Sequence, residues 1–297
     1  MFAFVLRIWF LASPLLWLPG SLPPGKPAPT GSGPRSYRPT GTFGYPDGVA
    51  VDAYGTVYVV DSDNQTVKKV GPAGEITTLA DHLNYPTGVA VAPDGTVYIT
   101  DAGSHSLLRI SPIGQVTTLA RNLAHPSAVA LAPDGTVVVA EAATEAGKGV
   151  VSRIGPGGRA TVLAQGLNKP AGVAVAPDGT VYVADTDNNS ILKISPNAPA
   201  AVLLSQGLHQ PHGLAVDATG TLYIADTYAN SVQKISPAGE LSLVAGSLAY
   251  PAGVALAPDG SLYITDTGSG GLKKVTAAGV LSTLEENAGQ ALRWVAG

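Results

Sequence analysis

"PTGVAVAPDGTVYITD", residues 86–101, occurs in six versions along the chain. The starts of consecutive versions are separated by 40, 40, 44, 41 and 40 residues. A fixed period of this length is typical of solenoids and propellers, in which each repeat is one supersecondary unit. The six versions begin at Pro46, Pro86, Pro126, Pro170, Pro211 and Pro251. The repeat is therefore the unit from which this fold is built.

One repeat predicts four short strands. Residues 88–92, "GVAVA", are small and apolar, as in a strand buried on both faces, and "PDG" at 93–95 predicts a turn. Residues 96–100, "TVYIT", are rich in β-branched and aromatic side chains, and residues 107–110 and 116–120 predict two further strands. No segment has a helical period. The predicted fold class is all-β, a six-bladed β-propeller of four-stranded antiparallel blades.

The sizes of the side chains support a closed ring. The first predicted strand of each repeat is rich in Gly, Ala and Val, which suit the crowded axis of a propeller, and the second strand carries Tyr in five repeats. One blade cannot bury its own faces, so the ring must close. A strand from residues 35–43 could close it but is not required, and Trp294 is expected to pack onto the last blade.

Composition narrows the class of partner. The 297 residues contain no cysteine, which excludes disulfides and Cys-ligated metals. Between Asp47 and Glu286 the chain has 21 acidic and 12 basic residues, a surplus of nine negative charges. Binding to nucleic acid needs clustered Lys and Arg, so no nucleic-acid partner is expected.

The N-terminus has a different composition. Residues 2–18 are almost wholly apolar, with Arg7 as the one charge, so we expect residues 1–20 to be a signal peptide or membrane anchor. Residues 21–45 predict a Pro/Gly-rich linker, 46–287 the propeller and 288–297 a C-terminal tail. This organisation predicts an extracytoplasmic protein, secreted, periplasmic or membrane-anchored, which meets a membrane only through its N-terminal segment. If that segment is not a targeting signal, an intracellular scaffold is the alternative.

The repeats resemble a known family. The segments "DSDNQTVKKV" (61–70), "DTDNNSILKI" (185–194) and "DTYANSVQKI" (226–235) are similar to the NHL repeat. With the N-terminal segments, the chain resembles the extracytoplasmic sensor domain of actinobacterial receptor Ser/Thr kinases, although it has no kinase domain. More distantly it resembles gluconolactonase/regucalcin-like enzymes, streptogramin lyases and peptidyl amidating lyases. These relatives include enzymes and binding modules, so the resemblance leaves the function open.

An acidic residue follows the second strand of every repeat. Asp is typical of turns, where it accepts hydrogen bonds from loop amides, and we expect that structural role here. The loops around it lack the Gly and the distal Glu of a calcium loop. The acidic residues are Asp61, Asp101, Glu141, Asp185, Asp226 and Asp266.

Two variable positions flank the proline of each repeat. The residue after it is Asp47, Thr87, Ser127, Ala171, His212 and Ala252 in turn, and the residue before it is Tyr45, Tyr85, His125, Lys169, Gln210 and Tyr250. Amidating lyases place zinc-binding His after such prolines on several blades, but here His212 is alone, which does not support a three-ligand zinc site. Tyrosines around a mouth are good binding material, although they could simply pack the loops.

The third repeat deviates from the others. Its loop 141–150 is four residues longer, and longer loops often carry specificity. Glu141 and Glu145 could act as acid, base or metal ligand there, as one Glu does in the lactonase-like relatives. A plain surface insertion is the alternative.

Two functions follow. The first is a non-catalytic extracytoplasmic propeller that binds a protein, cell-wall or small-molecule ligand as a monomer, without a cofactor. Its ligand-binding mouth would comprise Tyr45, Tyr85, His125, Glu145, Lys169, His212 and Tyr250. The alternative is a metal-dependent hydrolase or lyase that uses a divalent cation, with Asp47, Glu141 and His212 as its catalytic residues at one mouth of the channel.

Overall fold

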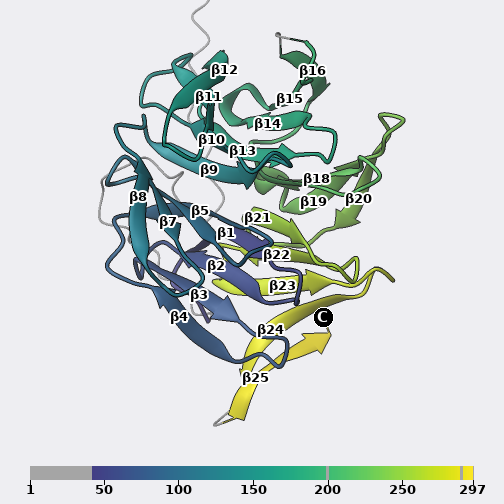
Figure 1. The fold of residues 1–297 in the computed structure, drawn as a ribbon. Helices are drawn as coiled ribbons and strands as arrows, with labels where there is room; N and C mark the ends of the chain where they lie inside the picture. Colours follow the sequence, from purple (N-terminus) through teal and green to yellow (C-terminus); the bar gives the residue numbers. More distant parts are fainter. Residues whose placement is uncertain (1–41, 199–200, 288–289, 297) are drawn as a thin grey trace, which may run out of the picture. The chain divides into compact units, whose positions relative to one another are not determined.

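The computed structural model describes residues 42–198, 201–287 and 290–296. These residues form six antiparallel sheets of consecutive strands, which confirms the six-bladed propeller (Figure 1). Blades 1 to 3 contain β1 (Pro46–Val51), β2 (Val57–Asp61), β3 (Thr66–Val70), β4 (Ile76–Ala80), β5 (Pro86–Val91), β6 (Val97–Asp101), β7 (Ser106–Ile110), β8 (Val116–Ala120), β9 (Pro126–Leu131), β10 (Val137–Glu141), β11 (Gly149–Ile154) and β12 (Ala160–Leu167). Blades 4 to 6 contain β13 (Pro170–Val175), β14 (Val181–Asp185), β15 (Ser190–Ile194), β16 (Val202–Gln206), β17 (Pro211–Val216), β18 (Leu222–Asp226), β19 (Ser231–Ile235), β20 (Leu241–Ala245), β21 (Pro251–Leu256), β22 (Leu262–Asp266), β23 (Gly271–Val275), β24 (Leu281–Asn287) and β25 (Gln290–Ala296).

Each blade is a series of hairpins closed by tight turns. In the "PDG" turn of blade 2, Gly95 has φ +84°, a conformation that L side chains rarely adopt, and the Asp94 carboxylate accepts the Thr96 N–H at 2.9 Å. The hairpin also fixes which loops share an end of the propeller. Pro86 pairs with Asp101 and Val91 with Val97, so the start of a first strand and the loop after the second strand lie together. We call that end the P-x-G rim.

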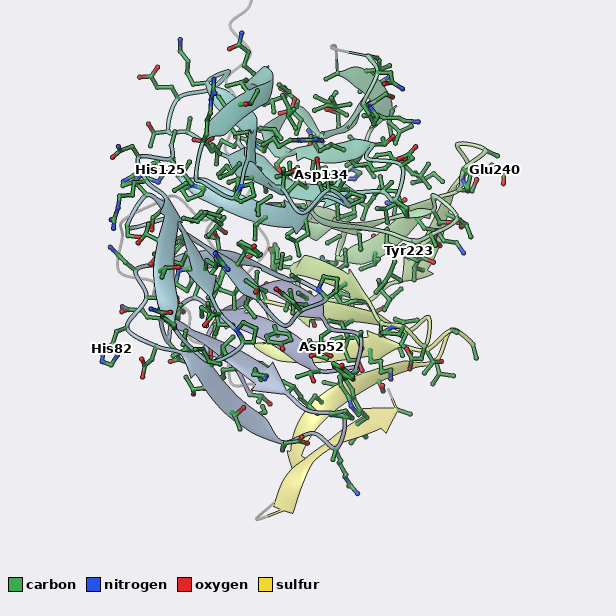
Figure 2. The ribbon with its side chains drawn as sticks, in the orientation of Figure 1. Asp52, His82, His125, Asp134, Tyr223 and Glu240 are labelled. Atoms are coloured by element: carbon green, nitrogen blue, oxygen red, sulfur yellow. The ribbon has the colours of Figure 1, made fainter. Side chains whose placement is uncertain are left out.

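The opposite end carries the turns between first and second strands. In Figure 2, His82 and His125, which precede first strands at the P-x-G rim, lie at the left of the view. Asp52 and Asp134, which belong to the turns of the opposite rim, lie further to the right. The two rims are thus built from different parts of the repeat.

The core lies between neighbouring blades. In one apolar cluster Tyr58 and Val60 of blade 1 pack with Val89 and Ile99 of blade 2, and equivalent clusters follow around the ring. The tyrosine of the second strand therefore fills space between blades, as its bulk predicts. Close to the axis the backbones themselves touch: a Cβ on Gly213 would lie 2.5 Å from the Ala252 carbonyl oxygen. Glycine is required there because no side chain fits.

A hydroxyl joins each blade to the next at the P-x-G rim. In four blades the donor is the Ser or Thr directly after the buried acid, and the acceptor is the carbonyl of the next blade's first proline. In blades 2 and 3 that position is Ala, and the hydroxyl comes instead from the residue after the proline. We call these the inter-blade hydroxyl bonds. They run from Ser62 to Pro86, Thr87 to Pro126, Ser127 to Pro170, Thr186 to Pro211, Thr227 to Pro251 and Thr267 to Pro46, at 2.6–2.9 Å.

Blades 6 and 1 close the ring face to face. Thr265 and Thr267 donate to the carbonyls of Asp47 and Pro46, and the Phe43 N–H donates to the Gly270 carbonyl at 3.0 Å. No strand of one blade is supplied by another in the described part of the chain. Of the residues 35–43 considered for closure, 35–41 lie outside the described residues, and residues 42–45 are not in a strand.

The C-terminal segment extends the last blade. β25 pairs antiparallel with β24, with Leu284 opposite Trp294, so the segment expected as an unassigned tail includes a fifth strand. The Trp294 ring lies 5.6 Å from that of Tyr263, edge to face, which confirms that Trp294 packs on the last blade. Strand β25 thus shields an outer edge that the fourth strands of the other described blades leave open.

Two features complete the fold. Short 3₁₀ turns, η1 (Thr186–Asn188) and η2 (Thr227–Ala229), form in the loops after the second strands of blades 4 and 5, where the sequence predicts no helix. The segment expected as signal or anchor, and most of the linker, fall outside the described residues. Among the residues described, no helix has the length and apolar character to span a bilayer.

Candidate functional site at the channel mouth

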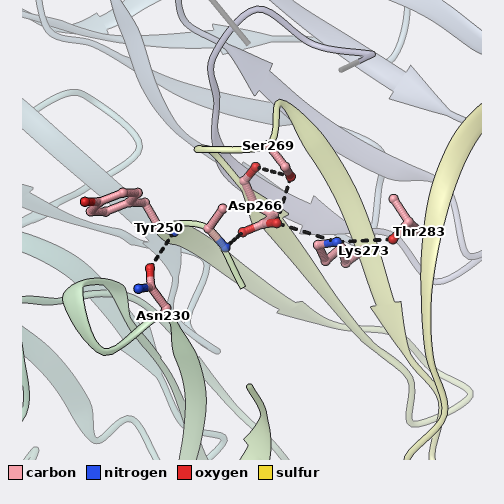
Figure 3. A network of polar contacts seen from close by, with 7 residues as sticks. Asn230, Tyr250, Asp266, Ser269, Lys273 and Thr283 are labelled. Atoms are coloured by element: carbon pink, nitrogen blue, oxygen red, sulfur yellow. Dashed lines mark hydrogen bonds and ion pairs between the residues drawn. The ribbon is translucent and has the colours of Figure 1, made fainter. Parts of the chain in front are cut away.

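The acid after each second strand has the structural role that its turn position predicts. In every blade its carboxylate accepts a backbone N–H from the residue 17 positions earlier: in blade 4, for example, Asp185 accepts from Asn168 at 2.6 Å. Burial raises the pKa of the Asp101 and Asp266 carboxyls. The Asp266 carboxylate accepts the Ala249 N–H at 2.6 Å, and Figure 3 shows it beside the Ser269 hydroxyl and Lys273. These acids hold the rim loops in place.

Glu141 has the same structural role in blade 3. Its two carboxylate oxygens accept the Ala124 N–H at 2.8 Å and the Ser152 hydroxyl at 2.9 Å, and the residue is 8% exposed. Glu145 is exposed on the longer loop. Neither glutamate lines the cavity at the mouth. The structure therefore does not bring Glu141 together with Asp47 and His212.

A narrow cavity of about 60 Å³ lies on the propeller axis at the P-x-G rim. Each blade contributes three consecutive residues from the start of its first strand. The lining residues are 47–49, 87–89, 127–129, 171–173, 212–214 and 252–254. Every residue that follows a first-strand proline is among them, so the variable position identified in the sequence does face the channel.

Asp47 and His212 are the two titratable residues in this described lining. They stand on β1 and β17, on either side of blade 6, whose matching residue Ala252 is buried and small. Thr87 and Ser127 line the same cavity, and their hydroxyls form inter-blade hydroxyl bonds. As the titratable residues of the described lining, Asp47 and His212 supply the charge and acid–base chemistry of the mouth.

The donors present do not fit a protein-held divalent metal. Within residues 42–198, 201–287 and 290–296 there is no group of three His, Asp or Glu side chains that could hold a metal ion. A catalytic zinc site takes three protein ligands, and calcium takes six to eight oxygen ligands. Asp47 and His212 by themselves do not make up such a ligand set at this mouth.

The residues before the prolines form local contacts on the rim and do not line the cavity. Tyr45 is buried, whereas Tyr85 is 37% exposed. His125 lies edge to face on His105, with ring centroids 4.8 Å apart, and Tyr250 does so on Tyr228 at 5.6 Å. The predicted aromatic mouth is thus a set of separate clusters, each shared with a loop that follows a second strand.

One of these contacts is an ion pair, between Lys169 and Asp187 at 2.8 Å. Sequence reasoning missed Asp187, Tyr228 and His105 as rim residues. The sequence holds a signal for Asp187 and Tyr228, because the second residue after the acid that ends the second strand differs between blades. It is Asp63, Gly103, Asp187, Tyr228 and Gly268 in the five loops of equal length.

Comparisons with known proteins agree with this fold. Residues 32–275 match the sequence model of the virginiamycin B lyase family. A structure of a catalytically inactive histidine-to-alanine variant of virginiamycin B lyase from Staphylococcus aureus, with quinupristin, superposes with a TM-score of 0.63 at 18% identity, over 81% of this chain and 84% of that one. A gluconolactonase from Xanthomonas campestris gives 0.66 at 22% identity, over 75% and 84%.

A chain of a nidogen/laminin complex gives 0.66 at 24% identity, over 77% of this chain and 93% of that one. At these identities the structures share the propeller fold with this chain and carry no function to it. A search of curated proteins found no match. The match to the family model spans most of the chain, from before β1 to the end of β23, and on this ground the chain belongs to the virginiamycin B lyase family.

Proposed function

We propose that this protein is a non-catalytic binding module that engages its ligand at the P-x-G rim, with Asp47 and His212 as the charged and hydrogen-bonding contacts in the channel mouth. The composition of the cavity wall carries the proposal. In the described lining, Asp47 and His212 are the titratable side chains, and the others are small or aliphatic. Glu141 of blade 3, which could have been a third catalytic residue, instead bonds to the backbone of a loop.

The size of the cavity limits what can enter. Pockets for drug-sized ligands measure roughly 300–1,000 Å³, whereas this one measures about 60 Å³. One small polar group of a ligand, or a few water molecules, can occupy such a space. The rest of the ligand must lie outside, across the loops of the rim, as a large ligand or a partner macromolecule would.

We further propose that the module works outside the cytoplasm, as a sensor or scaffold for a protein, cell-wall or small-molecule ligand, and that it is a monomer. The proposed location rests on the apolar segment 2–18 and the Pro/Gly-rich stretch after it. Fractionation of cells that express the full chain or a chain without residues 1–20 tests the location. Both proteins in the cytosol would contradict it.

A ligand screen tests the binding site. The full-length protein is screened by thermal shift against organic acids, amines, sugars and lactones, and hits are measured by calorimetry. Asp47→Asn or His212→Gln is expected to weaken a hit at least about ten-fold, as for other central polar contacts. The control Glu240→Gln, in the exposed turn between β19 and β20 on the opposite rim, should leave the affinity unchanged. Hits insensitive to both substitutions, or no hit at all, would overturn the proposal.

A lyase is the second candidate, favoured by the family match and by His212. In the virginiamycin B lyase of Staphylococcus aureus, replacement of one histidine by alanine gives a catalytically inactive enzyme. An elimination needs a base to take a proton and an acid to protonate the leaving group, and Asp47 and His212 are groups of these two kinds. Chromatography of quinupristin incubated with the protein tests this: conversion that His212→Ala abolishes supports a lyase, and no conversion rejects it for this substrate.

A further inference from the structure

The P-x-G rim is uneven, because the second residue after the acid carries a side chain in some blades and is glycine in others. In blades 2 and 6 that residue is Gly103 or Gly268, where a Cβ would lie 2.7 Å or 2.5 Å from a backbone oxygen. No side chain can project at these two places. In blades 4 and 5 the same loop position carries Asp187 and Tyr228. The repeat thus presents polar and aromatic groups in this sector, next to His212 at the channel.

The groups of this sector are held by one another. Asp187 pairs with Lys169 at 2.8 Å and accepts from the Gln210 side-chain amide at 3.5 Å. The Gln210 N–H donates to the Asn189 side chain at 2.9 Å. These contacts fix a carboxylate, an ammonium and an amide side by side on the loops of blades 4 and 5.

The aromatic part continues into blade 6. Tyr228 and Tyr250 meet edge to face. The Tyr250 N–H donates to the Asn230 side chain at 3.1 Å (Figure 3). Tyr228 remains 38% exposed. Burial raises the pKa of its hydroxyl, and the neighbouring Tyr250 and Asp187 raise it further. The Tyr228 N–H donates to the carbonyl of His209 at 3.0 Å, directly before Gln210, whose side chain contacts Asp187. Asp187 and the two tyrosines therefore belong to one surface, which we call the blade 4–6 patch.

The chemistry of this patch selects a class of ligand. The charges of Lys169 and Asp187 cancel within their ion pair, so the patch has little attraction for a strongly charged ligand. It offers donors and acceptors next to each other, which suits hydroxyl groups because each hydroxyl both donates and accepts. An exposed tyrosine adds a rigid amphipathic face at low entropic cost. Neutral sugars combine adjacent hydroxyls with apolar C–H faces.

We propose that the blade 4–6 patch binds a neutral carbohydrate chain, with Tyr228 under a sugar ring and Asp187, Lys169 and Gln210 bonded to its hydroxyls. The proposal deepens the binding function proposed above and rests on it. A chain lying over the patch can reach the channel mouth at its end, because Gln210 and His212 are two residues apart at the start of β17. The narrow cavity then receives a terminal group, and the patch binds the body of the chain.

A glycan array with the full-length protein provides the test, with hits measured by calorimetry. The expected result is binding to one or more neutral oligosaccharides, weakened at least about ten-fold by Tyr228→Ala or Asp187→Ala, as for an interface anchor. Tyr228→Phe keeps the ring and should change the affinity no more than about three-fold. The control is Tyr54→Ala, at an 86% exposed tyrosine on the opposite rim. Equal thermal midpoints show that the variants are folded.

Three results would overturn the proposal: no glycan bound, acidic glycans alone bound, or neutral glycans bound equally by the variants. A ligand from the earlier screen that depends on Asp47 or His212 but not on Tyr228 would retain the proposed function and remove this inference. A ligand whose binding depends neither on Asp47 or His212 nor on Tyr228 would contradict both the proposed function and this inference. The two proposals can therefore fail separately.

Discussion

The Thr267 hydroxyl donates to the carbonyl oxygen of Pro46 at 2.7 Å, across 221 positions of the sequence. The bond joins blade 6 to blade 1, and it repeats the bond by which blades 1, 4 and 5 hold the next blade. The ring is thus closed by the same device that connects consecutive blades. What differs is the length of chain between donor and acceptor.

Removal of this closing hydroxyl should destabilise the whole propeller. Thr267→Val keeps the shape of the side chain but leaves a buried carbonyl of Pro46 with one partner fewer. We expect the free energy of unfolding to fall by about 1–3 kcal/mol, the range for a buried group left unsatisfied, as measured by urea denaturation. Substitution of the exposed Thr219 by Val, on the opposite rim, is the control. Equal effects of the two substitutions would contradict the closing role.

In blade 2 the inter-blade hydroxyl comes from a different position, so a second substitution should restore stability that is lost when this hydroxyl is removed. Thr87 donates to the Pro126 carbonyl at 2.9 Å, where four other blades use the residue after the acid, and that residue is Ala102 here. Thr87→Ala should cost about 1–3 kcal/mol, and the second substitution Ala102→Ser should restore about 1 kcal/mol of it. A double-mutant cycle in urea measures the coupling. Additive effects would show that the two positions do not serve one bond.

Substitution of Glu141 and of Glu145 should affect the stability of the protein differently. Glu141→Ala leaves the Ala124 N–H and the Ser152 hydroxyl without their acceptor. It should lower the free energy of unfolding by about 2–6 kcal/mol, since each of the two unsatisfied groups costs about 1–3 kcal/mol. Glu145→Ala, at an exposed site, should change it by less than about 0.5 kcal/mol. Thermal and urea unfolding give both values. A neutral Glu141→Ala that abolished ligand binding would instead favour a role at the site.

The buried Asp266 should make stability depend on pH. Burial raises the pKa of this carboxyl above its ordinary value of 3.8, against the opposing effects of its hydrogen bonds and of Lys273. The folded protein therefore keeps a proton that the unfolded chain has released. The stabilisation is complete below 3.8 and declines as the pH rises through the raised pKa.

Asp266→Asn should flatten this part of the profile, measured by urea denaturation at a series of pH values from about 4 to 7. The control is Asp259→Asn. Hydrogen bonds from Ser261 lower the pKa of Asp259, so its contribution is present above 3.8 and lost on acidification. If stability changed with pH in the same way in both variants, the opposite pKa shifts of Asp266 and Asp259 would be contradicted.

Much of the architecture is legible in the repeat. The period of about 40 residues, the four apolar segments and the turn glycines predict six four-stranded blades, because each of these signals is local or strictly periodic. The turn role of the acid after the second strand is also predictable, since Asp accepts loop amides in many turns. Strand β25 escaped prediction because nothing in the repeat corresponds to it, and its packing depends on contact of Trp294 with Tyr263.

Part of the candidate site could likewise be predicted from the sequence, and part could not. The position after each proline could be assigned to the channel from the repeat alone, because its place in the blade is the same six times. The partners of these residues could not be assigned from the repeat. The hydroxyls of Thr87 and Ser127 bond to the next blade because Ala102 and Ala142 lack a hydroxyl, and that exchange appears only when neighbouring blades are in contact. The repeat period predicts where a residue lies within its blade. Its hydrogen-bond partners belong to the adjacent blade, and they come within reach only when the blades pack into the closed ring.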